Sequence, residues 1–145
     1  MEPVDVYLGS VPDDLLERWN AAMPDGFRVL SFLLPREGAP SLGRECRVAL
    51  YWVRSPGVLS RDELIDRARA HYGEAVMDAG DAVGEDSAGW TSLLLAEPAR
   101  NGVGGWVKAM IASGDLGGWQ DVNIVRVAIG LWDGTKVELP GRLAP

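Results

Sequence analysis

Cysteine and histidine are nearly missing from this chain of 145 residues. Cys46 is the only cysteine and His71 the only histidine. A single cysteine cannot form a disulfide within the chain, and one cysteine with one histidine cannot supply the four ligands of the common structural zinc sites. We therefore expect no disulfide framework, no metal site of that kind and no resident cofactor.

Lysine is also scarce, since it occurs only as Lys108 and Lys136, and the formal net charge is -7. Binding to nucleic acid depends on clustered Lys and Arg, so the composition argues against a nucleic-acid partner. The apolar run at 48–53, VALYWV, has the length of a strand and is far too short to cross a bilayer. The N-terminus MEPVDVYLGS shows no secretory signal. We expect no membrane partner and a cytoplasmic protein.

What the chain does contain is enough for an ordinary core. Its hydrophobic content is 47%, and it has six Trp residues, which need either burial or a binding role. The length suits one domain. We predict a single α+β domain over residues 1–145, with possible half-domains 1–84 and 85–145 that share a sheet.

The first half reads as six alternating elements. Alternation from Val4 to Leu8 predicts a strand, and Ser10 with Asp13 resembles a capping box that begins a helix with its apolar stripe at Leu15, Leu16, Trp19, Ala22 and Met23. After a Pro-Asp-Gly turn, residues 27–34 predict a second strand. A third strand is predicted at 44–54. Ser60 and Glu63 then form a stronger capping box for a helix that stops at Gly73, and 74–83 read as an edge strand.

The second half predicts a strand at 90–96, a short helix around 106–111 and a long strand at 123–132. Asp133-Gly134 predicts a two-residue hairpin turn into a strand at 135–139. The order βαββαβ over the first six elements matches a ferredoxin-like unit. A βαββ partial second unit follows it.

Local patterns that could carry chemistry have simpler structural interpretations. Gly102, Gly104 and Gly105 precede a helix and could bind an anion, but they match no phosphate-loop motif. The acidic run 78–86 could attract a hard cation, although a solvated loop is the simpler interpretation. Cys46 and His71 are expected to be structural, because neither has a marked catalytic partner.

The tryptophans divide into two groups. Trp19 and Trp52 lie on predicted core faces, whereas Trp90, Trp106, Trp119 and Trp132 all lie in the second half. Exposed Trp is common at binding surfaces. We therefore take Trp106, Trp119, Lys108 and Arg126 as candidate binding residues around a groove in the second half.

Several phrases of the sequence resemble a bacterial domain of unknown function associated with radical-SAM proteins. They are LLERWNAAMPDGFRVL at 15–30, APSL at 39–42, RVALYWV at 47–53, VLSRDELIDRARA at 58–70 and NIVRVAIGLW at 123–132. The resemblance implies work beside a radical-SAM enzyme. The chain lacks the three cysteines that bind the cluster in such enzymes, which favours an accessory role.

Three hypotheses follow from these patterns. The first is a non-catalytic accessory protein that binds a radical-SAM enzyme or the substrate of that enzyme. The second is a small enzyme or small-molecule binder that uses the groove near Trp106 and Trp119. The third is a self-associating module, a homodimer, whose last strand is a pairing edge.

We predict no tight binding of RNA or DNA. A gel-shift titration with the host's total tRNA at about 150 mM salt should show no complex in the micromolar range, because the acidic chain repels phosphates at long range. Tight binding that is lost steeply at higher salt would contradict this prediction.

Overall fold

A computed structural model of the chain describes residues 6, 8 and 10–141. Residues 10–41 form what we call the arm, and residues 42–141 form the sheet lobe. The helices and strands are α1 (Leu15–Ala22), α2 (Leu42–Glu45), β1 (Val48–Arg54), α3 (Arg61–Tyr72), β2 (Val76–Asp81), β3 (Thr91–Ala96), α4 (Val103–Ser113), β4 (Asn123–Trp132) and β5 (Val137–Glu138). Two short 3-10 turns lie at Gly73–Ala75 and Trp119–Asp121.

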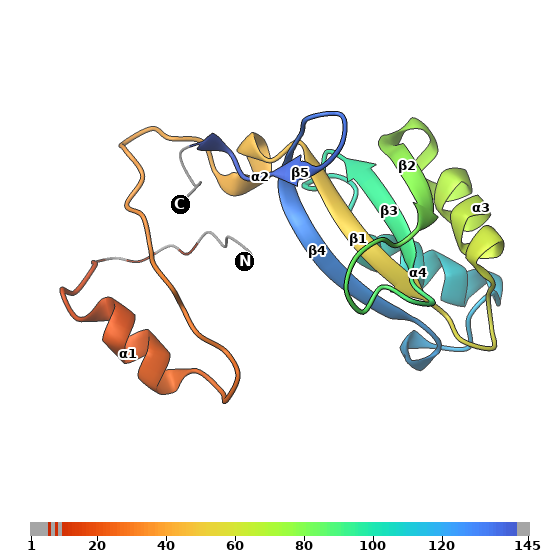
Figure 1. Cartoon of the computed structure of the whole chain (residues 1–145), viewed down its shortest axis with the longest axis horizontal. Coiled ribbons are helices and arrows are strands. Elements are labelled where there is room, and N and C mark those ends of the chain that lie inside the picture. Colours follow the sequence, from red (N-terminus) through yellow and green to blue (C-terminus); the bar gives the residue numbers. More distant parts are fainter. Residues whose placement is uncertain (1–5, 7, 9, 142–145) are drawn as a thin grey trace.

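The strands form one antiparallel sheet in the order β2-β3-β1-β4-β5 (Figure 1). The connection from β1 through α3 to β2 passes over β3, and the connection from β3 through α4 to β4 passes over β1. Strands from residues 1–84 (β1 and β2) and from residues 85–145 (β3, β4 and β5) are therefore interleaved within a single sheet. The mixed α+β class that the sequence predicts is confirmed.

One face of the sheet buries the core of the protein. Alternate residues of β1 (Ala49, Tyr51 and Val53) and of β3 (Leu93 and Leu95) point toward α3 and α4. The two helices supply the other side of this core. Their buried residues are Leu64, Ile65 and Ala68 from α3, and Trp106, Val107 and Met110 from α4.

The predicted capping box at the start of α3 is confirmed. The Glu63 backbone N–H donates to Ser60 Oγ at 3.3 Å, and the Ser60 backbone N–H donates to Glu63 Oε2 at 2.8 Å. The helix ends at Gly73, which has a positive φ of 57°. Two backbone N–H groups at the start of α3 are thus hydrogen-bonded by nearby side chains. The residue at which α3 begins is therefore determined by the local sequence.

The end of the sheet at β5 depends on Gly130. A Cβ at this position would collide with the backbone carbonyl of Glu138, so only glycine lets the chain return this closely over β4. The returning strand was predicted at 135–139 and covers Val137–Glu138. The predicted two-residue turn at Asp133-Gly134 is wrong. Four residues separate the paired Trp132 and Val137, and the Asp133 carboxylate accepts backbone N–H groups from within that loop.

The arm differs most from the sequence prediction. The helix α1 forms, but its N-cap is Asp14 and no side chain caps it, so the predicted capping box of Ser10 and Asp13 is wrong. Residues 27–34, predicted as a strand, join no strand of the described residues and have no regular secondary structure. Val6 and Leu8 of the predicted first strand are exposed and irregular, and Val4 lies outside the described residues. The predicted βαββαβ unit over residues 4–83 therefore does not form as expected.

No helix within the described part of the chain is long and apolar enough to cross a membrane.

Candidate functional site

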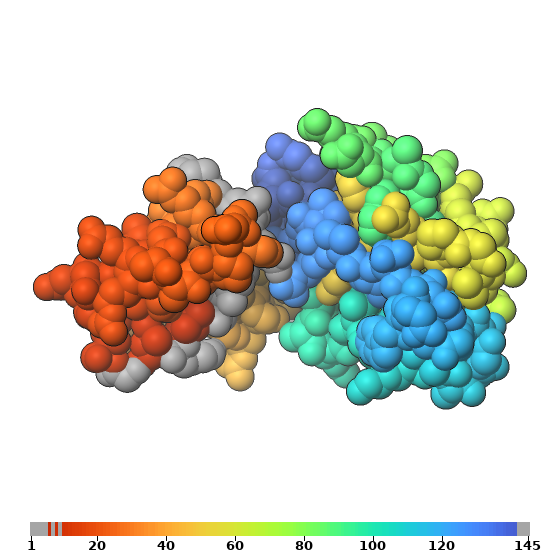
Figure 2. Space-filling view, turned by 90° about the horizontal axis from the view of Figure 1, so that it is seen from below, coloured from red at the N-terminus to blue at the C-terminus, as the bar shows by residue number. Residues whose placement is uncertain are grey.

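The arm carries a cluster of exposed apolar side chains, and it projects to one side of the sheet lobe (Figure 1). Figure 2 shows the same separation from a second direction. Phe27 is 72% exposed and Leu34 is 68% exposed. Between them Leu30, Phe32 and Leu33 are also exposed. Of α1 itself, only Leu15 is buried. An apolar segment that hides so little of its surface is typical of a region that binds another molecule.

The arm nevertheless has a defined local shape. The Asn20 side chain on α1 holds the extended segment after the turn, because its Oδ1 accepts from the Val29 backbone N–H at 2.7 Å and its Nδ2 donates to the Val29 carbonyl at 3.0 Å. Gly26 provides the positive φ of 87° that the turn requires. The Asn20 side-chain amide thus makes the two hydrogen bonds with Val29 that a neighbouring strand would make. The apolar side chains on either side of Val29 remain exposed to solvent.

A pocket on the sheet lobe is rich in arginine. It lies between α2, the residues that lead into β1, and the turn from β3 to α4, and its volume is about 370 Å³. The lining residues are Gly43, Arg44, Cys46, Arg47, Glu97, Ala99 and Arg100. We call it the Arg pocket. Three guanidinium groups and one carboxylate give it a positive charge on a chain whose net charge is -7.

A second pocket of about 280 Å³ lies at the opposite end of β1 and is lined in part by Arg54 and Arg61. Both arginines are engaged there. The Arg54 guanidinium carbon lies 4.2 Å from the centre of the Trp90 ring, and Arg61 Nε lies 3.1 Å from the Asp81 carboxylate. Trp90 also contacts Trp52, with 6.3 Å between ring centres. The interactions at this end are those of a packed aromatic cluster.

The candidate binding residues from the sequence do not come together. Trp106 is 1% exposed and packs in the core against Tyr72, so its side chain faces no groove. Trp119 is 53% exposed on the turn before β4, Lys108 is exposed on α4, and Arg126 is exposed on β4. The Arg pocket was missed because its arginines come from two segments about fifty residues apart, and no local motif marks them.

The other patterns noted in the sequence have structural roles. Cys46 is buried, and the His71 ring packs edge-on against Tyr72. Within the acidic run, Asp81 pairs with Arg61. Among the described residues, no three His, Cys, Asp or Glu side chains are close enough to hold a metal ion.

Tyr72 links α3 to the start of α4. Its hydroxyl donates to the Gly102 carbonyl at 3.0 Å, and burial raises the pKa of the phenol. The Trp106 indole N–H beside it has no hydrogen-bond partner among the described residues. Since an unsatisfied buried donor costs about 1–3 kcal/mol, the apolar packing of Trp106 has to outweigh that cost.

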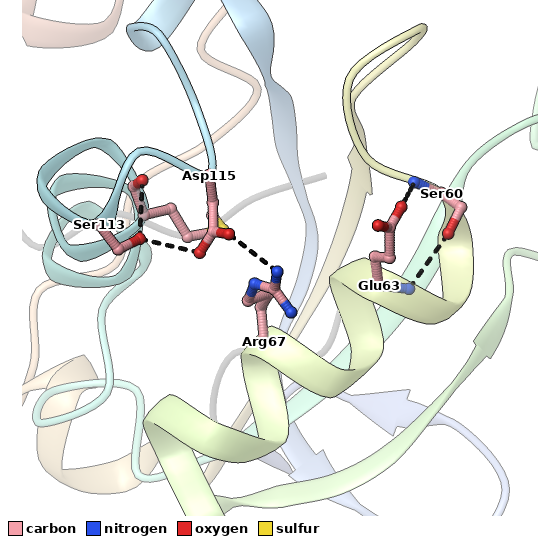
Figure 3. A network of polar contacts seen from close by, with 6 residues as sticks. Ser60, Glu63, Arg67, Ser113 and Asp115 are labelled. Atoms are coloured by element: carbon pink, nitrogen blue, oxygen red, sulfur yellow. Dashed lines mark hydrogen bonds and ion pairs between the residues drawn. The ribbon is translucent and has the colours of Figure 1, made fainter.

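One ion pair joins the two helices across the core edge (Figure 3). Arg67 on α3 donates to Asp115 Oδ1, after α4, at 2.8 Å, and Ser113 Oγ donates to Asp115 Oδ2 at 2.8 Å. The hydrogen bond from Arg67, followed by that from Ser113, lowers the pKa of Asp115, and the same pairing raises the pKa of Arg67. This network joins the middle of α3 to the residues at and just after the end of α4.

With the fold and these surfaces described, comparison of the chain with protein-family models, with curated proteins and with solved structures finds no match.

We expect Asp115→Asn to lower the free energy of unfolding at neutral pH and to flatten its acid dependence. The pKa of Asp115 is lowered in the folded state, so its stabilisation is present above the pKa of the unfolded chain and is lost as the pH falls through the folded pKa. Urea unfolding from pH 7 down to about pH 3 would measure this effect. Glu74→Gln, which removes an exposed carboxylate on the same lobe, is the control. An equal fall in the free energy of unfolding at acid pH for wild type and Asp115→Asn would contradict this role of Asp115.

Proposed function

We propose that this protein is a non-catalytic accessory protein that docks on a partner protein through its arm. The observation that carries the proposal is the exposure of five large apolar side chains within residues 27–34, namely Phe27, Leu30, Phe32, Leu33 and Leu34. Full burial of one such side chain contributes about 1.5–3 kcal/mol. Several of them in one segment are enough for a specific interface, even after the cost of ordering the segment.

We propose that the partner is a radical-SAM enzyme. The longest phrase of the sequence that resembles the radical-SAM-associated domain, LLERWNAAMPDGFRVL, lies wholly within the arm. It contains the helix, the turn and the start of the exposed apolar segment. The longest phrase behind the resemblance therefore lies in the segment whose apolar side chains need an external surface to cover them.

The sheet lobe is proposed to act as the folded platform for the arm. Its order β1-α3-β2-β3-α4-β4 and the crossovers that each skip one strand support assignment of residues 48–132 as a ferredoxin-like unit. The unit would then begin at β1, later in the chain than the sequence suggested. In this assignment the arm is an extension that precedes the unit.

The alternative function, a small enzyme or small-molecule binder with a groove beside Trp106, is not carried forward in that form. Trp106 is a core residue and cannot line such a groove.

The proposal predicts that the triple variant Phe27→Ser/Leu30→Ser/Leu34→Ser loses binding to a radical-SAM enzyme of the same host. Replacing three exposed apolar side chains removes interface area and leaves the core of the sheet lobe intact. Affinity measured by surface plasmon resonance should fall by at least about a hundredfold, as expected for loss of several hot-spot side chains.

The matched control is Met77→Ser/Val83→Ser, which removes apolar side chains exposed on the sheet lobe. It should bind like wild type. Unchanged affinity of the arm variant would contradict docking through the arm. A host with no radical-SAM gene nearby, together with a pull-down that recovers no radical-SAM enzyme, would contradict the choice of partner.

A further inference from the structure

We propose that the Arg pocket binds the phosphate group of a small molecule. The site is separate from the arm, and the inference is independent of the accessory role proposed above. It rests on the residues that line the pocket, on how the backbone holds them, and on the charge of the rest of the chain.

The backbone around Arg47 is fixed on both sides. Its N–H donates to the Gly130 carbonyl of β4 at 2.8 Å, and its carbonyl accepts from the Glu97 N–H at 2.8 Å. Gly43 of α2 faces Ala99 across the pocket, where the two segments approach closely. The segment with Arg44 and Arg47 and the turn with Arg100 are therefore held together by the sheet, independently of any ion pair between them.

The turn at Glu97 is held in an unusual conformation. Glu97 has a φ of 50°, which a residue with a side chain rarely adopts. Its carbonyl accepts the N–H groups of Arg100 and Asn101, at 2.9 Å and 3.0 Å. These bonds bring Arg100 to the rim of the pocket that Arg44 and Arg47 line.

The charges in the pocket are not balanced. Arg100 pairs with Glu97 at 3.5 Å, and both side chains are largely exposed. The structure records no ion pair for Arg44 or Arg47 among the residues that it describes. Each guanidinium presents a planar set of N–H donors that fits phosphate oxygens in pairs. A phosphate with two negative charges would accept hydrogen bonds from Arg44 and Arg47 and compete with Glu97 for Arg100.

The size of the pocket and the charge of the chain favour a small phosphorylated molecule over a nucleic acid. A volume of about 370 Å³ accommodates a phosphate with a small attached group. A polymer of phosphates would extend beyond the pocket onto a chain whose net charge is -7, where it would be repelled.

The test is a titration of the full chain, labelled with ¹⁵N, with inorganic phosphate and with pyrophosphate at about 150 mM salt. We expect saturable shifts of the Gly43, Ala99 and Arg100 amide signals. Arg44→Gln or Arg47→Gln should weaken binding about tenfold, because each removes charged hydrogen bonds to the ligand. Glu97→Gln should strengthen binding, since it removes the competing carboxylate.

Arg69→Gln is the matched control, because Arg69 is exposed on α3 outside the pocket, and it should change the affinity by less than about twofold. The opposite signs expected for Arg47→Gln and Glu97→Gln distinguish ligand binding from damage to the fold, which would weaken binding in both. Equal weakening by Arg69→Gln, tighter binding of tRNA than of pyrophosphate, or equal shifts with acetate would each overturn the proposal.

Discussion

The packing of α3 and α4 against one face of the sheet holds the remaining structure in place. Trp106 and Leu64, from the two helices, meet Leu93 and Leu95 from β3 in one continuous core. Every other described feature of the sheet lobe is attached to this core. The Arg67–Asp115 ion pair lies at the edge of this core, and the turn at Glu97 leads from β3 of the sheet into α4. The Arg pocket therefore rests on a rigid base although its side chains are exposed.

The arm stands outside this arrangement. It contains a helix and a turn with good local hydrogen bonds, but local bonds alone stabilise a short helix only marginally in water. A folded element is normally stabilised further by burial of its apolar face, but only Leu15 of α1 is buried, and the large apolar side chains of residues 27–34 are exposed. The arm and the Arg pocket thus suggest two separate uses of one protein. The first is to contact a partner protein, and the second is to hold a small anion.

The elements that the sequence predicts well are those with local determinants. The Ser60 and Glu63 side chains, three residues apart, accept hydrogen bonds from free N–H groups at the start of α3. The residues that form the sequence pattern are therefore the same residues that form the contact. The bounds predicted for β4, residues 123–132, are those that the structure shows. In contrast, residues 27–34 have the composition of a strand but lie beside no sheet edge in the part of the chain that the structure describes. Strand formation depends on such an edge, which the sequence of the segment alone does not specify.

The same reasoning explains the candidate site. Trp106 was expected near a groove because tryptophans crowd the second half, yet its spacing with Val103, Val107 and Met110 is that of a helical stripe that packs inward. The Arg pocket could not be predicted, because the pairing of β1 with β3 brings Arg47 beside Glu97. Contacts that arise from strand register appear only once the sheet order is known.

The central claim is that the arm is not part of the cooperative fold and is exposed for a partner. Hydrogen exchange of the isolated full chain, followed by mass spectrometry at low protein concentration, tests this most directly. Amides of β1, β3 and α4 should exchange slowly, and peptides that cover residues 27–34 should exchange rapidly until the proposed partner enzyme is added. Protection of residues 27–34 equal to that of Leu93–Leu95 in the isolated protein would contradict the account.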